Sequence, residues 1–220
     1  MDRMVNLKTL VLGGFIAVAT VLQCGQAQAG TEKLIVAGGC FWCVESDFES
    51  VDGVKGAVSG YIGGSAETAE YKKITKGGTG HYEAVEITFD NKKVSRDELL
   101  HKFFRSVDPT DAGGQFCDRG DSYRTAVFYK NNAQKTAADS AKAMAQKDLG
   151  RNIVNPILSA GEFYKAEKYH QDYYKGQKIV LTRFGPKKQS EAYKRYREAC
   201  GRDQRVKQLW GSDAAFADKY

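Results

Sequence analysis

A short apolar run that ends in two glycines and a cysteine constrains the fold of this 220-residue chain more than any other feature. Residues 33–37 are mostly branched and apolar, which predicts a short buried strand that ends at Gly38-Gly39. Large apolar side chains then recur at helical spacing, so a helix is expected over residues 41–50. Cys40 therefore falls where a strand turns sharply into the start of a helix.

This position favours a reactive thiol at Cys40. The first turn of a helix has backbone amides without helical partners and carries the positive end of the helix dipole. Both stabilise a thiolate over a thiol, so we expect Cys40 to be nucleophilic with a lowered pKa. Gly38 and Gly39 would allow the sharp turn and leave room for a substrate.

The rest of the pattern predicts a mixed sheet packed against helices. Strands are expected over residues 54–62, 83–89, 123–129 and 152–158, and helices over residues 95–107, 132–149 and 190–199. The helix at 95–107 opens with a capping box formed by Ser95 and Glu98. The element order predicts an α+β fold with a split βαβ (ferredoxin-like) mixed sheet, helices on one face and an extended carboxyl-terminal segment anchored by Trp210 and Phe216.

The first 29 residues differ in character from the rest. Arg3 and Lys8 precede an almost entirely apolar run at residues 10–22, and Ala27-Gln28-Ala29 has the small-x-small pattern of a signal-peptidase site. We expect a secretory signal cleaved after Ala29 and a periplasmic or secreted protein without a membrane span. An uncleaved amino-terminal anchor and a lipoprotein at Cys24 are the alternatives.

The remaining residues 30–220 suit a single domain with a tail from about residue 186. Removing the signal takes away two basic residues and one acidic residue, which lowers the net charge from +6 to +5. The basic residues are scattered along the chain, so a solvated basic surface is expected and no nucleic-acid footprint. We also expect a monomer.

Four cysteines remain after the signal is removed: Cys40, Cys43, Cys117 and Cys200. In an oxidising compartment they could form two structural disulfides in a domain without enzymatic activity. They could also hold zinc. The spacing Cys40-x-x-Cys43 would further suit a thiol-disulfide oxidoreductase of thioredoxin type, although the intervening Phe-Trp is unusual for that class.

Five short motifs in order resemble the methionine sulfoxide reductase A family. They are Gly39-Cys40-Phe41-Trp42 and residues 60–64, 80–83, 118–124 and 169–171. The similarity extends from roughly Lys33 to Gly176, with a further match at residues 200–203. The resemblance implies thiol-dependent reduction of the S epimer of methionine sulfoxide, free or in proteins, with a thioredoxin-like reductant and no cofactor or metal.

The resemblance also implies roles for individual residues. Cys40 would attack the substrate sulfur, and Glu83 would supply the proton to the oxygen. Tyr61 and Tyr123 would hydrogen-bond that oxygen, Asp118 matches the active-site aspartate of the family, and Phe41 and Trp42 would enclose the methyl group. This use of Glu83 as an acid requires a raised pKa, so Glu83 should be buried beside aromatic residues.

The attack would leave a sulfenic acid on Cys40, which a second cysteine must convert to a disulfide. Cys43 lies three residues on and within bridging reach on the helix. The family more often has glycine at this position and a resolving cysteine in the tail, where Cys200 lies. Both cysteines therefore stay open for this role. Cys117 is expected to pack beside Asp118.

Overall fold

The computed structural model describes residues 30–219. The predicted signal sequence, its cleavage site at Ala29 and the alternative lipoprotein residue Cys24 all lie outside the described residues. Within residues 30–219, no helix is long and apolar enough to span a membrane.

A six-stranded mixed sheet forms the centre of the molecule, with strand order β7-β6-β1-β3-β2-β8. In chain order these strands are β1 (Thr31–Gly38), β2 (Val54–Ile62), β3 (Tyr82–Asp90), β6 (Thr125–Tyr129), β7 (Ile157–Ser159) and β8 (Phe163–Lys165). Neighbouring strands are antiparallel except β6 and β7, which are parallel and connected through a helix. Strand β1 therefore lies at the centre of the sheet, and its carboxyl end leads directly to Cys40.

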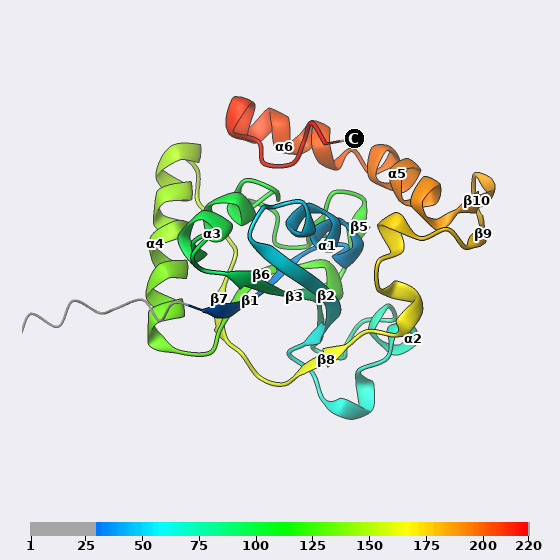
Figure 1. Cartoon of the computed structure of the whole chain (residues 1–220), viewed down its shortest axis with the longest axis horizontal. Helices are drawn as coiled ribbons and strands as arrows, with labels where there is room; N and C mark the ends of the chain where they lie inside the picture. Colours follow the sequence, from blue (N-terminus) through cyan, green and yellow to red (C-terminus); the bar gives the residue numbers. More distant parts are fainter. Residues whose placement is uncertain (1–29, 220) are drawn as a thin grey trace, which may run out of the picture.

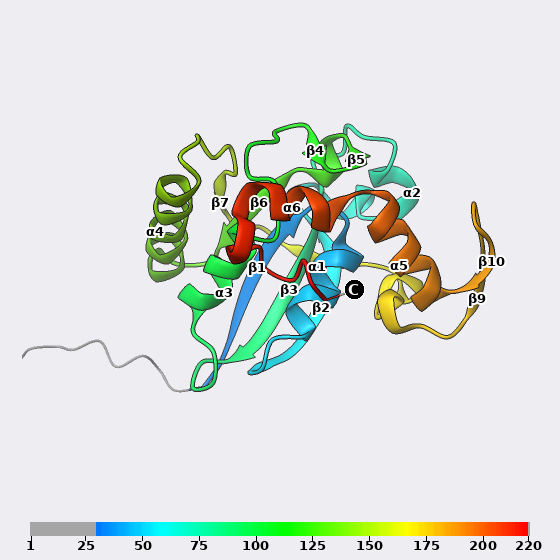
Figure 2. The same cartoon turned by 90° about the horizontal axis from the view of Figure 1, so that it is seen from above.

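The helices form layers on one side of this sheet. They are α1 (Phe41–Glu49), α2 (Tyr71–Ile74), α3 (Arg96–Phe104), α4 (Asn132–Leu149), α5 (Gln189–Ala199) and α6 (Arg202–Trp210). Helices α1 and α3 lie against the sheet, and α6 lies above them (Figure 1). The view in Figure 2 shows the same stacking from above, with α4 at one end of the molecule and α5 towards the other.

Two hydrophobic clusters occupy the two faces of the sheet. The larger one combines the inward faces of α1, α3, α4 and α6 with alternate strand residues such as Val36 and Val85. The smaller one contains Ile35, Ala84 and Phe128 and is covered by residues that follow α4, including Leu158 and Phe163. Helices thus cover one face, as predicted, and an irregular segment covers the other.

The sequence pattern predicted the α+β class and most elements of the sheet, and the structure confirms them. Helix α3 is capped as expected, because the Ser95 hydroxyl accepts the Glu98 amide at 3.1 Å. The helix ends at Phe104, three residues earlier than predicted. The strand predicted over residues 152–158 is reduced to β7 at 157–159. Strand β8 and the hairpin of β9 (Ile179–Thr182) and β10 (Gly185–Lys188) were not predicted.

The carboxyl-terminal segment is not extended, so this part of the prediction is wrong. Residues 202–210 form α6, with Arg202, Val206 and Trp210 buried on one helix face at intervals of four residues. The side chain of Trp210 donates from its indole nitrogen to the Val107 carbonyl at 3.4 Å. The periodic face was missed because Arg202 counts as polar in a hydrophobicity pattern although its side chain is buried.

Candidate active site

Cys40 is the residue that caps the amino terminus of α1, as the sequence predicted. The preceding Gly39 has a φ of +81°, a left-handed conformation that glycine adopts without strain. A Cβ atom at Gly39 would also lie 2.6 Å from the Cβ of Gln115, closer than atoms can pack. The turn that presents Cys40 therefore requires glycine on both conformational and steric grounds.

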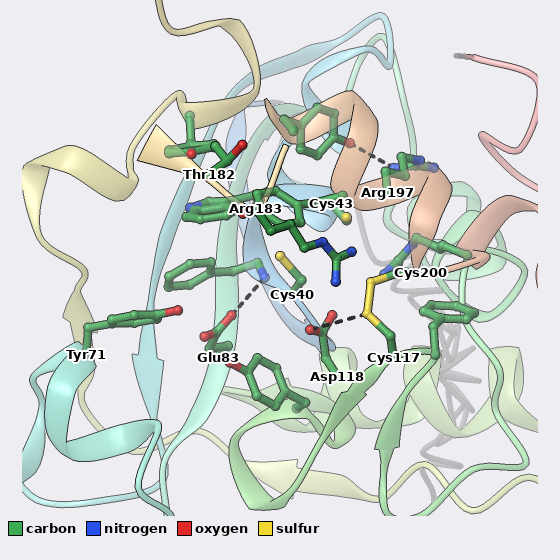
Figure 3. A pocket seen from close by; sticks show the side chains of 18 of the residues that line it. Cys40, Cys43, Tyr71, Glu83, Cys117, Asp118, Thr182, Arg183, Arg197 and Cys200 are labelled. Atoms are coloured by element: carbon green, nitrogen blue, oxygen red, sulfur yellow. Dashed lines mark hydrogen bonds between the residues drawn. A yellow bond between two sulfur atoms is a disulfide. The ribbon is translucent and has the colours of Figure 1, made fainter. Parts of the chain in front are cut away.

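All four cysteines of the described chain line one cavity of about 400 Å³ (Figure 3). Glu83 and Asp118 line the same cavity. Cys40 and Cys43 are free thiols, whereas Cys117 and Cys200 form a disulfide. The resemblance implied that Cys40, Glu83 and Asp118 share one site, with Cys200 left open as a resolving cysteine, and the structure places all of them around this cavity, together with Cys117.

Glu83 lies in the position that a proton donor needs. It is on β3 and 1% exposed, and its Oε2 atom accepts the amide hydrogen of Phe41 at 3.1 Å. The pKa of Glu83 is raised to about 8, first by burial and also by the nearby Asp118 carboxylate, while the Phe41 hydrogen bond opposes the shift. The predicted burial is confirmed, and Glu83 holds a proton at neutral pH.

The predicted low pKa of Cys40 is wrong for the substrate-free protein. The pKa of Cys40 is raised, first by its hydrogen bond with Cys43 and then by burial and by nearby negative charges that include Glu83 and Asp118. The backbone amides of the first turn of α1 do not donate hydrogen bonds to the Cys40 sulfur. The amide of Phe41 donates to Glu83, and the amides of Cys43 and Val44 donate to the Cys40 carbonyl.

Cys43 carries the more acidic thiol of the pair. The hydrogen bond from Cys40 lowers the pKa of Cys43 to about 7, and the positive charges of Arg202 and Arg197 act in the same direction against burial. Both guanidinium groups are buried and both line the cavity. They come from α6 and α5, so two helices near the carboxyl terminus place positive charge beside a cysteine of α1. Neither arginine was predicted from the sequence to belong to the site.

A buried carboxylate holds these arginines in place. Arg197 donates to Asp47 Oδ1 at 2.8 Å, and Nε of Arg202 lies 3.9 Å from Asp47 Oδ2. Arg202 also donates to the carbonyl of Gly38 at 3.0 Å, one residue before the active-site turn. In the sequence, Arg202 stands in line with Val206 and Trp210 at intervals of four residues. A charged residue in line with apolar residues on one helix face is the signal that could have indicated a buried arginine.

The disulfide between Cys117 and Cys200 changes two expectations. Cys117 does not merely pack beside Asp118, because it is bonded to the tail, with Cα atoms 4.9 Å apart. Cys200 is correspondingly not a free thiol in this state. The bond also excludes a zinc site built from four thiolates here, since two of the four sulfurs are already joined.

Tyr61 does not line the cavity, although the resemblance implied a role for it there. Its side chain is fully buried, and its hydroxyl donates to Glu167 Oε2 at 2.7 Å. Tyr71 and Tyr123 line the cavity instead, and their side chains interact by a hydrogen bond. Tyr71 was missed because α2 is only four residues long and has no periodicity to read. An isolated aromatic residue in a polar stretch is the one signal that could have indicated it.

Phe41 and Trp42 form an apolar part of the cavity wall, as the sequence predicted. The Trp42 ring stacks on Tyr173 with centroids 3.8 Å apart and an interplanar angle of 4°. Its indole nitrogen donates to Nδ1 of His170 at 3.2 Å. Burial lowers the pKa of His170 to about 4, so this imidazole stays neutral and orients Trp42.

Asp118 begins the short strand β5 (Asp118–Arg119), which pairs with β4 (Gly114–Gln115), and lies next to the disulfide. Its carboxyl oxygen Oδ1 is 3.8 Å from the Cys117 sulfur, and burial raises its pKa, with Arg202 opposing the shift. The cavity thus combines two thiols, two acidic side chains, the tyrosines Tyr71 and Tyr123 close to them, and an apolar wall. It can place a small molecule between a sulfur nucleophile and a protonated carboxyl group.

Comparison with known proteins identifies the family of the chain. The sequence model of the family described as peptide methionine sulfoxide reductase matches residues 32–213. The chain is 44% identical over 207 residues to peptide methionine sulfoxide reductase MsrA 2 of Rhizobium meliloti, covering 94% of this chain and 96% of that protein. It is 43% identical over 212 residues to peptide methionine sulfoxide reductase MsrA 2 of Caulobacter vibrioides, with coverages of 96% and 100%.

Solved structures agree with this relationship. Methionine sulfoxide reductase A of Corynebacterium diphtheriae superposes with a TM-score of 0.61 at 31% identity, covering 68% of this chain and 76% of that chain. Reduced Mxr1 from Saccharomyces cerevisiae superposes with a TM-score of 0.64 at 29% identity, covering 67% and 86%. With a family match over residues 32–213 and relatives aligned over nearly its whole length, this chain belongs to the peptide methionine sulfoxide reductase family.

Proposed function

We propose that this protein reduces the S epimer of methionine sulfoxide to methionine and so repairs oxidised proteins. The observation that carries the proposal is the burial of Glu83 in the cavity that also contains the free thiol of Cys40. Sulfoxide reduction needs a sulfur nucleophile and an acid for the oxygen, and Glu83 is protonated at neutral pH. Family membership supports this reaction over that of a thioredoxin-type oxidoreductase.

In the first step, the Cys40 sulfur attacks the sulfoxide sulfur. The proton of Cys40 passes to Cys43, its hydrogen-bond partner with a pKa of about 7. Glu83 gives a proton to the sulfoxide oxygen, and Tyr71 and Tyr123 donate hydrogen bonds to that oxygen as it gains negative charge. Burial raises the pKa of both tyrosines, so each keeps its hydroxyl hydrogen for donation. Methionine leaves, and the oxygen remains on Cys40 as a sulfenic acid.

In the second step, we propose that Cys43 resolves the sulfenic acid. The proton that Cys43 took in the first step passes to the oxygen of the sulfenic acid. The Cys43 sulfur then attacks the Cys40 sulfur, so that a disulfide forms and the oxygen leaves as water. Cys43 is in hydrogen-bond contact with Cys40, whereas Cys200 is already bonded to Cys117. Arg197 and Arg202 favour the thiolate that this attack requires.

Cysteine variants test both steps. Cys40→Ser should abolish reduction of methionine sulfoxide, because the nucleophile is lost. With a thioredoxin-type protein as the reductant, Cys43→Ser should complete one turnover and then stop, while Cys200→Ser should keep recycling. Mass mapping of disulfides after one equivalent of substrate should identify a Cys40–Cys43 bond. Steady turnover by Cys40→Ser would refute the assignment of the nucleophile, and a Cys40–Cys200 bond would refute that of the resolving cysteine.

A dithiol protein of thioredoxin type is the proposed reductant. Returning the Cys40–Cys43 bond to two thiols takes two electrons and two protons, which one dithiol supplies by exchange. The cavity is open enough for Cys40 to be partly exposed, which supports access by such a partner. No cofactor is needed in this scheme.

We further propose that residues 1–29 direct export and are removed after Ala29. The basic start, the apolar run and the small-x-small site support this reading. Residues 30–220 would then act as one catalytic domain, monomeric and periplasmic or secreted, with a tail from about residue 186. Amino-terminal sequencing of the protein purified from its native host would test the cleavage site.

For the fold, we propose that the four central strands form a split βαβ unit of the ferredoxin-like kind. The order β6-β1-β3-β2 with antiparallel neighbours supports it, as do the connections through α1 and α3. Strands β1 and β2 flank β3, so the β1-α1-β2 crossover is split by a strand that comes later in the chain.

A further inference from the structure

The hairpin of β9 and β10 projects from the body of the protein beside the active-site cavity. Both cartoon views place it at the end of the molecule opposite α4 (Figures 1 and 2). Leu181, Thr182 and Arg183 line the cavity together with Cys40, whereas no residue of β10 does. Figure 3 shows Thr182 and Arg183 around the same cavity as Cys40 and Cys43. Strand β9 is therefore the part of the hairpin that borders the site.

One face of β9 exposes large apolar side chains to solvent. Ile179 is 69% exposed and Leu181 is 86% exposed, and residues two apart in a strand point to the same side. Only three other large hydrophobic residues are exposed among residues 30–219, and one of them, Tyr169, is 52% exposed. A protein that buries its other apolar side chains but leaves this group exposed has an interaction surface there.

Tyr169 is a further exposed aromatic residue close to the cavity wall. Its ring lies 4.2 Å from that of His170, which in turn lies 4.3 Å from the ring of Tyr71 in the cavity wall. Its carbonyl accepts a hydrogen bond from Gln189, the residue that follows β10, at 3.5 Å. Tyr169 thus lies between the base of the hairpin and the cavity.

Strand β9 also has an unpaired edge. In the described part of the chain, β9 pairs with β10 alone, in a sheet of two strands. An open edge offers backbone N–H and C=O groups to another extended chain, and proteins usually block such edges with charge or with a covering element. An edge that carries Ile179 and Leu181 is instead suited to bind an extended peptide.

We propose that the exposed face and edge of β9, with Tyr169, bind the polypeptide segment that flanks an oxidised methionine. The proposal rests on the proposed reductase function and specifies its substrate as methionine sulfoxide in unfolded or extended protein segments. The sulfoxide side chain enters the cavity, and the residues next to it in the substrate lie along β9. This occupant follows from continuity, because the surface begins where the cavity lining ends, at Leu181.

The charge of the hairpin indicates which flanking peptide segments should bind best. Residues 176–188 contain Lys178, Arg183, Lys187 and Lys188 and no acidic residue. A basic surface favours acidic partners and disfavours basic ones, and this preference weakens as salt is added. We therefore expect apolar flanks that also carry aspartate or glutamate to bind better than flanks with lysine.

The test compares two substrates with dithiothreitol as the reductant. One is N-acetylmethionine sulfoxide, which reports the chemistry alone. The other is a peptide with one central methionine sulfoxide between apolar and acidic residues. The Ile179→Ser/Leu181→Ser double variant should lower the ratio of kcat/KM for the peptide to kcat/KM for the small substrate about tenfold, mainly through KM. Ile179→Ser alone should lower it less, because Ile179 lies outside the cavity lining.

Met144→Ser is the matched control. Met144 is 46% exposed on α4, at the other end of the molecule, so its replacement should leave the ratio unchanged. An unchanged ratio in the double variant, or an equal fall with Met144→Ser, would overturn the proposal. A fall that occurs only with a thioredoxin-type reductant would assign the surface to the reductant and also overturn it. If the unmodified protein did not reduce N-acetylmethionine sulfoxide at all, the reductase function itself would be refuted, since this small substrate needs no docking surface.

Discussion

At the scale of single residues, the active site is governed by how protons are shared among three neighbouring groups: Glu83, Cys40 and Cys43. Glu83 keeps its proton to about pH 8, and Cys40 gives a hydrogen bond to the more acidic Cys43. Cys40, the proposed nucleophile, is therefore a thiol in the substrate-free protein, and it lies next to Cys43, which can accept its proton. Such an arrangement limits unproductive oxidation of Cys40, because thiolates are the forms that oxidants attack.

Glu83→Gln should lower kcat by a hundredfold or more, within the range of roughly 10²- to 10⁴-fold for a positioned general acid. In the unmodified enzyme, kcat/KM should fall as pH rises through about 8, because Glu83 then loses the proton it donates. The residual activity of the variant should lack this fall. A pH profile of both enzymes with N-acetylmethionine sulfoxide checks the prediction, and an identical alkaline fall in the variant would contradict it.

The same substitution should affect stability in the opposite direction. Glu83 has a pKa of about 8 in the folded chain against an ordinary value of 4.5, so above pH 4.5 the unfolded chain releases a proton that the folded chain keeps. The stability contribution of Glu83 is thus present at low pH and is lost as pH rises towards 8. Glu83→Gln removes this dependence, and its Tm should equal or exceed that of the unmodified protein at pH 8. Thermal unfolding at pH 5 and pH 8 measures the difference.

At the scale of elements, α1 is held to α5 and α6 by charge as well as by packing. Asp47 of α1 is buried between Arg197 of α5 and Arg202 of α6. Arg197 also pairs with Asp203 at 2.7 Å, which balances the second positive charge. These contacts fix the helices that place positive charge beside Cys43.

Asp47→Ala should reduce the free energy of unfolding by about 3–5 kcal/mol, because it leaves the buried guanidinium group of Arg202 without its carboxylate partner and removes one of the two carboxylates that Arg197 contacts. Urea unfolding of the two proteins gives this value. Asp139→Ala is the control, since Asp139 forms a solvent-exposed pair with Lys135 one helical turn away, and such pairs contribute little to stability. Equal losses from the two substitutions would show that burial of the ionic cluster has no special effect.

At the scale of the whole molecule, the Cys117–Cys200 bond ties the tail to the active-site loop. It joins residues separated by 83 positions and lies between Asp118 on one side and Arg202 on the other. We interpret it as a structural tie that keeps α5 and α6 over the cavity, rather than as the bond formed in each turnover.

The double variant Cys117→Ser/Cys200→Ser should unfold more easily, by up to about 4.5 kcal/mol on the chain-entropy estimate for a loop of this length. Urea unfolding without reductant measures this loss. Dithiothreitol should bring the unmodified protein to the level of the variant and leave the variant unchanged. An identical unfolding midpoint for both proteins without reductant would contradict a stabilising role for the bond.

Local sequence patterns were sufficient to predict most of the elements and to single out Cys40 as the proposed nucleophile. Strand β2 and helix α4 have the predicted bounds, because alternation, helical spacing and capping residues are properties of neighbouring positions. The motif around Cys40 likewise placed the cysteine at the start of α1, and the burial required of Glu83 followed from its chemistry.

The surroundings of these residues, in contrast, depend on the tertiary structure. It brought Tyr71 into the cavity and directed Tyr61 to Glu167, placed two arginines of the tail beside Cys43, and bonded Cys117 to Cys200. These facts depend on residues far apart in the chain, and local periodicity carries no information about which of them meet. The pKa of Cys40 shows the consequence: its helix position favours a thiolate, but the neighbours that folding supplies favour the thiol.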